Sequence, residues 1–211
     1  SYIPTSGSTV TRAPDIATIE GNKFAKTNLL SYSERFDQSA WTKTNATVTP
    51  NVTSAPDGTA TADKLVTSSA TTFHLCNQTS TVNAGTFTAS VYAKKADFDW
   101  FLFKQDGGSA AGSAFKSAWF NLNIGSIGTV DSGLTANIKD VGNEWYRCSI
   151  SYTLTGSGST RIALIVASSD SSSTVVGNGS SGVYLWGAQL EEGDELTEYT
   201  PSVETFDSRA S

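Results

Sequence analysis

The feature that most limits what this chain can fold into is the alternation of apolar and polar residues with a period of two. From residue 28 onward the alternation fills short runs, and clusters of Gly, Ser, Asn and Asp separate them. This period is typical of β-strands, whose side chains point to opposite faces in turn, and the clusters are typical of turns. The predicted strands cover residues 47–51, 62–66, 73–79, 85–94, 99–105, 113–121, 129–130, 134–141, 145–155, 160–166 and 182–191. The pattern predicts an all-β fold, an antiparallel β-sandwich of the jelly-roll type.

Helical periodicity is nearly absent from the 211 residues, a length that suits one large all-β domain. One short helix is predicted over residues 34–41. Ser33 is its expected N-cap, because a serine hydroxyl can accept a hydrogen bond from a free backbone N–H at a helix start.

The alternation also assigns the two faces of individual strands. In GTFTASVYAKK, residues 87, 89, 91 and 93 are apolar and should face the core, which leaves Tyr92 and Lys94 on the opposite face. In WYRCSISYTL, Trp145 and Arg147 share the outward face with small hydroxyl residues. GVYLWGAQLEE is apolar on both sides, which predicts a central strand covered on both faces, with Val183, Leu185, Gly187 and Gln189 on one of them.

Composition narrows the class of partner. The net charge is −6 and charged residues make up 16% of the chain, whereas Ser, Thr, Asn and Gly supply the remaining polarity. Nucleic-acid binding depends on clustered Lys and Arg, so a nucleic-acid partner is not expected, and a neutral, hydroxyl-rich ligand fits better. No apolar run approaches the roughly 20 residues needed to cross a bilayer, and no leader-like segment is present, so membrane insertion is not expected.

The side chains that could perform catalysis do not form a recognisable set. A sandwich glycosidase needs a pair of carboxyl groups, but the acidic run 191–195 lacks the second Glu of the Glu-x-Asp-x-x-Glu pattern, and it is interpreted as a solvated turn. His74 has no Cys or second His at metal-ligand spacing. Cys76 and Cys148 are interpreted as buried small residues, with a single disulfide as the alternative. The prediction is a protein that is not an enzyme.

Sugar binding needs aromatic rings that stack on C–H groups, together with planar polar side chains that bond to neighbouring hydroxyls. Side chains of these kinds occur on predicted strands, and a packing role is the alternative for each tryptophan. The predicted ligand-binding residues are Tyr92, Lys94, Trp100, Gln105, Trp119, Trp145 and Arg147, with Asn121, Trp186 and Gln189 as further candidates.

The two ends of the chain share a sequence motif. At an offset of 199 − 2 = 197 residues, Tyr2 matches Tyr199, Pro4 matches Pro201, and Arg12 and Ala13 match Arg209 and Ala210. Similarity at a fixed spacing is typical of tandem units. Residues 1–15 are therefore expected to be the tail of a preceding module, although shared composition is an alternative.

Several strings, in order along the chain, carry a family resemblance: APDGTATADKLV, FTASVYAKK, AWFNLNIGSIGTV, DVGNEWYRCSISYTL and VYLWGAQLEEG. They resemble the carbohydrate-binding-module-like, concanavalin-like jelly rolls of bacteriophage tail fibres. The resemblance implies a linker over 1–27, a sandwich over 28–202 and an exit tail over 203–211. It also implies a virion protein made in the host cytoplasm, a homotrimer, and a bacterial surface glycan as partner. No cofactor is expected, and a structural calcium is left open because no dense Asp/Asn loop fixes a site.

Two other functions stay open at this point. One is a structural spacer or trimerisation module of the fibre, whose aromatic residues lie in subunit contacts. The other is a polysaccharide depolymerase, which the absent carboxylate pair disfavours.

Overall fold

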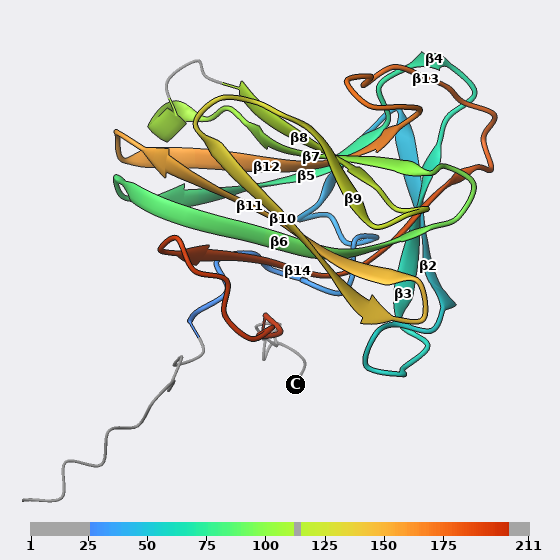
Figure 1. Cartoon of the computed structure of the whole chain (residues 1–211), viewed down its shortest axis with the longest axis horizontal. Coiled ribbons are helices and arrows are strands. Elements are labelled where there is room, and N and C mark those ends of the chain that lie inside the picture. Colours follow the sequence, from blue (N-terminus) through green and yellow to red (C-terminus); the bar gives the residue numbers. More distant parts are fainter. Residues whose placement is uncertain (1–25, 112–114, 203–211) are drawn as a thin grey trace, which may run out of the picture.

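The structure is a computed structural model, and it describes residues 26–111 and 115–202. Two antiparallel six-stranded sheets form the layers of a sandwich (Figure 1). Sheet A has the order β1 (Thr42–Thr44), β5 (Leu75–Val82), β12 (Gly158–Ala167), β7 (Trp100–Asp106), β8 (Phe115–Asn121) and β9 (Ser126–Val130). Sheet B has the order β10 (Leu134–Gly142), β11 (Trp145–Leu154), β6 (Gly85–Lys95), β14 (Gly182–Glu192), β3 (Ala62–Thr67) and β2 (Ala46–Thr53).

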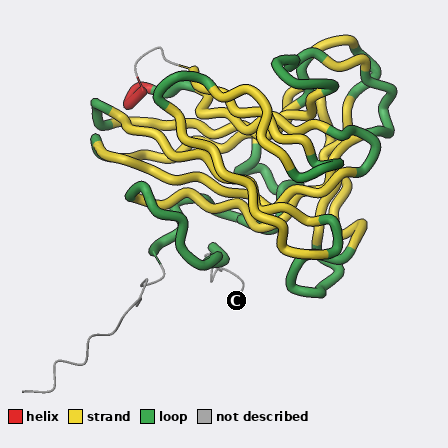
Figure 2. Tube along the Cα trace, viewed as in Figure 1, coloured by secondary structure: helices red, strands yellow, loops and turns green. Residues whose placement is uncertain are grey.

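Little else in the described residues is regular structure. Strands β4 (Thr71–Thr72) and β13 (Val175–Val176) form a small ribbon at one corner of the sandwich, and η1 (Ser109–Ala111) is a single 3₁₀ turn (Figure 2). The predicted all-β, antiparallel sandwich is confirmed, and each predicted strand overlaps an observed one. No helix in the described ranges is long and apolar enough to span a membrane.

The core lies between the two sheets and follows the period-two assignment. Phe87, Ala89, Val91 and Ala93 of β6 are buried in it, as predicted. Sheet A contributes Phe101 and Phe103 of β7 from the opposite side. Cys76 and Cys148 are both free thiols in this core, one from each sheet, which confirms their interpretation as buried small residues and excludes the disulfide in this structure.

The helix predicted over 34–41 is wrong. This segment consists of successive turns, in which Arg35 N–H donates to Tyr32 O, Gln38 N–H to Arg35 O and Trp41 N–H to Gln38 O. Phe36 and Trp41 are fully buried, with ring centroids 4.8 Å apart. Packing of these two rings into the core therefore outweighs the helical propensity of the residues between them.

The uninterrupted alternation predicted for β14 also needs correction. Val183 and Leu185 face the core, but Ala188 and Leu190 occupy it after a register shift between Trp186 and Gln189. Gly187 makes this bulge, with a positive φ of 60°. A Cβ there would lie 3.0 Å from Tyr92 Cδ2, so glycine suits both the backbone conformation and the close approach. The bulge exchanges the faces of all later residues of the strand.

Residues 28–33 run beside the second half of β14. They lie beyond Leu185, where the pairing of β14 with β3 ends. Leu29 N–H donates to Leu190 O, and Ala188 N–H donates to Ser33 O. Asn28 donates through Nδ2 to Ala188 O at 2.9 Å and accepts at Oδ1 from Leu190 N–H at 3.1 Å. The described chain thus begins beside β14, and it also ends there (Figure 1).

Candidate functional site

The outer face of sheet B carries four of the predicted ligand-binding residues, but the chain itself covers much of its central part, on β6, β11 and β14. The cover is residues 193–202, which follow β14 and which we call the strap. The strap bonds along the face: Thr88 Oγ1 donates to Gly193 O at 2.8 Å, and Thr200 N–H donates to Gln189 Oε1 at 2.8 Å. The central part of a face that the sequence assigns as outward is therefore inside the molecule, whereas the outward residues of β10 and β2 stay exposed.

Arg147 and Trp145 are both buried, Arg147 beneath the strap and Trp145 against Ser54, Ala55 and Ala62. Arg147 is 8% exposed, and it donates through Nη1 to Thr197 O in the strap at 2.8 Å and through Nη2 to Ser90 Oγ at 3.1 Å. Trp145 is 1% exposed, and its Nε1–H donates to Ser54 O at 3.0 Å. These side chains are held by internal hydrogen bonds, so the outer face of β11 does not present them to a ligand.

Tyr92 and Lys94 are also engaged. The Tyr92 ring lies edge-on to Trp186 and to Tyr199, with centroid distances of 5.3 and 5.9 Å, and the Arg147 guanidinium lies 5.3 Å from its centre. Lys94 donates to Asn143 O at 2.9 Å and pairs with Glu144 at 3.1 Å. The strap and a turn of sheet B account for both side chains.

Tyr199 anchors the strap. Its ring packs 4.8 Å from Trp186, centroid to centroid, and its hydroxyl bonds to Ser33 Oγ at 2.8 Å and to Glu34 Oε1 at 3.0 Å. Burial, the largest cause, raises the pKa of the Tyr199 phenol, so the phenol stays protonated and donates to the carboxylate. Burial likewise raises the pKa of Glu34, against the lowering effect of this hydrogen bond.

The acidic run after β14 is only partly the solvated turn that the sequence predicts. Glu192, Asp194 and Glu195 are exposed, but Glu191 is fully buried beneath the strap. Its carboxylate accepts from Thr197 Oγ1 at 2.6 Å and from Thr197 N–H at 3.0 Å. Glu191 therefore fixes the strap and is not placed to act on a ligand.

Gln105 is a further correction, because it does not face outward. It lies on the same face of β7 as the core residues Phe101 and Phe103. It is 1% exposed, and its side-chain amide donates to Gly107 O at 2.9 Å. The seven predicted residues therefore do not form one site. Four lie on the outer face of sheet B, Gln105 points inward, and Trp100 and Trp119 lie on the outer face of sheet A.

The outer face of sheet A has two halves. Its covered half is an apolar cluster of Leu75, Leu102, Ala163, Ile165 and Ala167 with the half-buried Trp100 and Trp119 packed against it. The loop after β12, which contains Asp170 and Ser172, is held to this half by hydrogen bonds. Trp119 Nε1–H donates to Ser172 O at 3.0 Å, and Asp170 accepts from Thr129 N–H at 2.8 Å. Trp100 and Trp119 thus lie in one cluster, where they mainly pack against its apolar side chains.

The open half lies further along the same strands. We define it as Asn77 and Thr79 of β5, Arg161 of β12, Lys104 and Asp106 of β7, and Phe115 of β8. Thr79 and Phe115 are exposed, Phe115 to 56%, and Asn77, Lys104 and Arg161 are partly exposed. Planar polar groups and an aromatic ring therefore reach the surface together in the open half.

Sequence reasoning did not select these residues, although their strands were predicted. Arg161 is the informative signal: it is a lone guanidinium at the start of the apolar run IALIVA, on the parity of the outward-facing Ala163 and Ile165. The pairing of β12 with β5 and β7 was needed to place Asn77 and Lys104 opposite Ala163, which is the next outward residue after Arg161.

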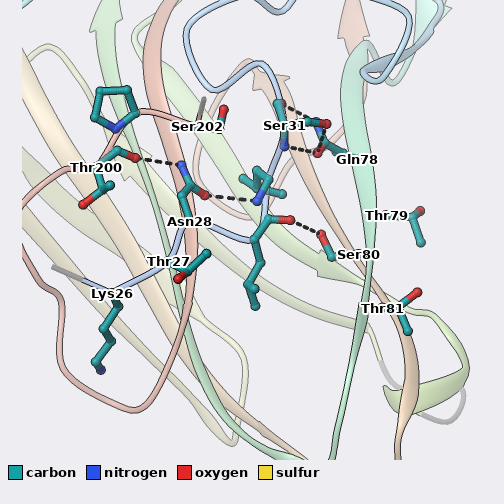
Figure 3. Close-up of a pocket in the computed structure, with 13 residues that line it drawn as sticks. Lys26, Thr27, Asn28, Ser31, Gln78, Thr79, Ser80, Thr81, Thr200 and Ser202 are labelled. Carbon is teal, nitrogen blue, oxygen red and sulfur yellow. Dashed lines mark hydrogen bonds between the residues drawn. The ribbon is translucent and has the colours of Figure 1, made fainter. Parts of the chain in front are cut away.

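A groove of about 640 Å³ adjoins the open half along the free edge of β5 (Figure 3). Its polar lining is mostly bonded internally. Gln78 exchanges hydrogen bonds with Ser31, Ser80 donates to Leu29 O, and Asn28 donates to Thr200 O. These bonds close the open end of the sandwich, so the groove is mainly structural, and Thr79 links its rim to the open half.

The single histidine has a structural role. His74 is fully buried, with Nδ1 2.5 Å from Asn45 O and Nε2 3.3 Å from Val175 O. Within residues 26–111 and 115–202, no three His, Cys, Asp or Glu side chains gather as a metal site. The predicted linker up to residue 25 and the tail 203–211 lie outside the described residues.

Comparison with known proteins found similarity among solved structures. No family model and no curated protein matches the chain. Among solved structures, the enzymatically active domain of tailspike protein 4 of bacteriophage CBA120 is similar with a TM-score of 0.48 and 17% identity, over 78% of this chain and 21% of that one. TmCBM61, solved with β-1,4-galactotriose, is similar with a TM-score of 0.48 and 12% identity, over 80% of this chain and 100% of that one. The chain thus spans about a fifth of the length of the tailspike domain.

Proposed function

We propose that this chain is a non-catalytic carbohydrate-binding domain of a phage tail fibre, and that it recognises bacterial surface polysaccharide through the open half of sheet A. One observation carries the proposal. The strap covers much of the outer face of sheet B, whereas the open half presents an amide, a guanidinium, an ammonium and an aromatic ring at the surface. The fibre setting rests on the sequence strings that resemble phage fibre domains.

The open half has the chemistry that a sugar requires. The Asn77 amide and the Arg161 guanidinium are planar and can bond to two neighbouring hydroxyls, and the exposed Phe115 ring offers an apolar surface to C–H groups. Within the described chain, neither Asn77 nor Thr79 has a side-chain hydrogen bond. A flat, open site of this kind binds weakly, so useful affinity comes from several linked copies, as in a homotrimer.

The carboxylates of the open half support the proposal of a binding role without catalysis. Glycosidases of most families use two carboxyl groups about 5–10 Å apart. Among the described residues, the open half holds one carboxylate, Asp106, which two cations neutralise at 3.2 and 2.8 Å. A depolymerase mechanism therefore lacks its second group at this face.

Hydrogen exchange in the presence of polysaccharide tests the location of the site. The chain is incubated with a panel of bacterial capsular polysaccharides, and amide protection is compared with and without each one. We expect new protection in β5, β7, β8 and β12 for at least one polysaccharide. New protection confined to β6, β11 and β14 would place the ligand on the other sheet, and no protection with any polysaccharide would remove the proposal.

The structural-spacer function remains the second candidate because apolar side chains are exposed away from the open half. Ile124 is 68% exposed and Val176 is 74% exposed. Mass measurement in solution discriminates between the two functions. A stable trimer in which hydrogen exchange at β5, β7, β8 and β12 is slowed by assembly favours the spacer, whereas a species that leaves these strands unprotected favours ligand binding.

A further inference from the structure

We propose that the open half selects acidic polysaccharides, with Arg161 and Lys104 binding a carboxylate of the sugar. This inference rests on the proposed function and names its ligand class. It reverses the preference for a neutral ligand that composition alone suggests, because it depends on the charges at one face and not on the net charge of −6.

Cations outnumber carboxylates in the open half. Lys104 Nζ lies 3.2 Å from Asp106 Oδ1, and Arg161 Nη2 lies 2.8 Å from Asp106 Oδ2, so two cations share one carboxylate. Elsewhere in the described chain, three lysines meet carboxylates one to one, in the pairs Lys64–Asp97, Lys94–Glu144 and Lys95–Asp99. An excess positive charge therefore remains at this face of an acidic protein.

Both cations keep donors for a ligand. The Arg161 side chain is 41% exposed, and Asp106 bonds to its Nη2, which leaves Nη1 without an acceptor among the described residues; Nε is buried and is not available to a ligand. Lys104 Nζ lies 4.9 Å from the centre of the Phe115 ring and meets a single carboxylate oxygen, although an ammonium has three donors. A guanidinium beside an ammonium is suited to a carboxylate, because the planar fork can bind both oxygens.

The neighbouring side chains can hold the rest of an acidic sugar chain. Thr79 lies across from Arg161 in the pairing of β5 with β12, and Phe115 lies across from Asp106 in the pairing of β7 with β8. From β5 to β8 the face spans three strand spacings, about 14 Å. A carboxylate bound centrally thus has a hydroxyl and an amide on one side and an aromatic ring on the other, which an extended oligosaccharide can reach together.

The experiment pairs each acidic capsular polysaccharide with its carboxyl-reduced form, in which every carboxylate has become a primary alcohol. Binding to the full chain is measured by calorimetry at low and high salt. We expect the acidic form to bind at least tenfold more tightly than the reduced form, and the difference to shrink at high salt. Equal binding of both forms would overturn the acidic preference but leave the proposed function standing. If the protein binds neither form of any polysaccharide in the panel, the proposed function itself is overturned.

Three substitutions assign the effect to this cluster. Arg161→Gln and Lys104→Gln should each weaken binding of the acidic form about tenfold and leave that of the reduced form nearly unchanged. Lys94→Gln, on sheet B, is the matched control and should change neither. Asp106→Asn should strengthen binding of the acidic form, because it releases both cations. Weaker binding by the Asp106→Asn protein, with circular dichroism unchanged, would contradict anion binding here.

Discussion

The strap makes the most quantitative prediction, through the anchor residue Tyr199. Tyr199→Phe removes two hydrogen bonds, at 2.8 Å to Ser33 and 3.0 Å to Glu34. One of these involves a carboxylate, so we expect a loss of about 1–3 kcal/mol in the free energy of unfolding. Tyr199→Ala also removes the ring contacts with Trp186 and Tyr92, and the expected total loss is about 3–5 kcal/mol.

The measured loss has an upper limit set by the strap itself. If the strap detaches while the sandwich stays folded, further weakening of its contacts no longer changes global unfolding. Urea unfolding followed by tryptophan fluorescence gives the global value. Limited proteolysis within residues 193–202 reports detachment, which should be faster in Tyr199→Ala than in Tyr199→Phe.

Glu198→Ala is the matched control for the strap. Glu198 is exposed beside Tyr199, and its backbone carbonyl, which alanine keeps, accepts from Gln189 and Thr197, so we expect a change within about 0.5 kcal/mol. Equal stability and equal proteolysis of Tyr199→Ala and Tyr199→Phe would refute the reasoning, because the buried ring would then contribute nothing.

Three further predictions concern the rest of the sandwich. Gly187→Ala should cost about 1–3 kcal/mol by urea unfolding, more than Gly179→Ala, because φ is positive at both but a Cβ at Gly179 meets nothing within 4 Å. Burial raises the pKa of Asp63 to about 6 from 3.8, so between these pH values the folded state holds a proton that the unfolded chain has lost. The free energy of unfolding should therefore fall as pH rises from 4 to 6. Asp63→Asn should remove this fall, and a variant that keeps the same slope would contradict the prediction. Cys76 and Cys148 are buried with raised pKa values, so a thiol reagent should label neither in the folded protein and both in denaturant; labelling before unfolding would contradict the core assignment.

Period-two alternation predicted the strands and most of their faces, because burial of one side of a sheet imposes that period directly. It failed at Gly187, since one extra residue in a bulge exchanges the faces of all that follow. It also treated Trp145 and Arg147 as available to a ligand, although their face is covered. Alternation identifies a face of a sheet, but a segment distant in sequence decides whether that face meets water.

The candidate site was harder to predict than the fold for a similar reason. Arg161, Lys104 and Phe115 come from three strands, and their proximity depends on the order β12–β7–β8 in sheet A. Strand order is a long-range property that periodicity does not contain. In the second copy of the motif shared by the two ends, Tyr199 and Ser202 hold the strap to Ser33. The first copy lies outside the described residues.

The strap also determines how the domain responds to mechanical load. Lys26 and Ser202, where the described chain begins and ends, line one groove, and Ser33 and Ser202 exchange hydrogen bonds at 2.9 and 3.0 Å. Tension between these points acts on such bonds one after another, so the strap should peel away before either sheet shears. Release of residues 194–202 would lengthen the molecule by about 30 Å. The chain would then extend at the strap while the surface formed by β5, β12, β7 and β8 keeps its shape.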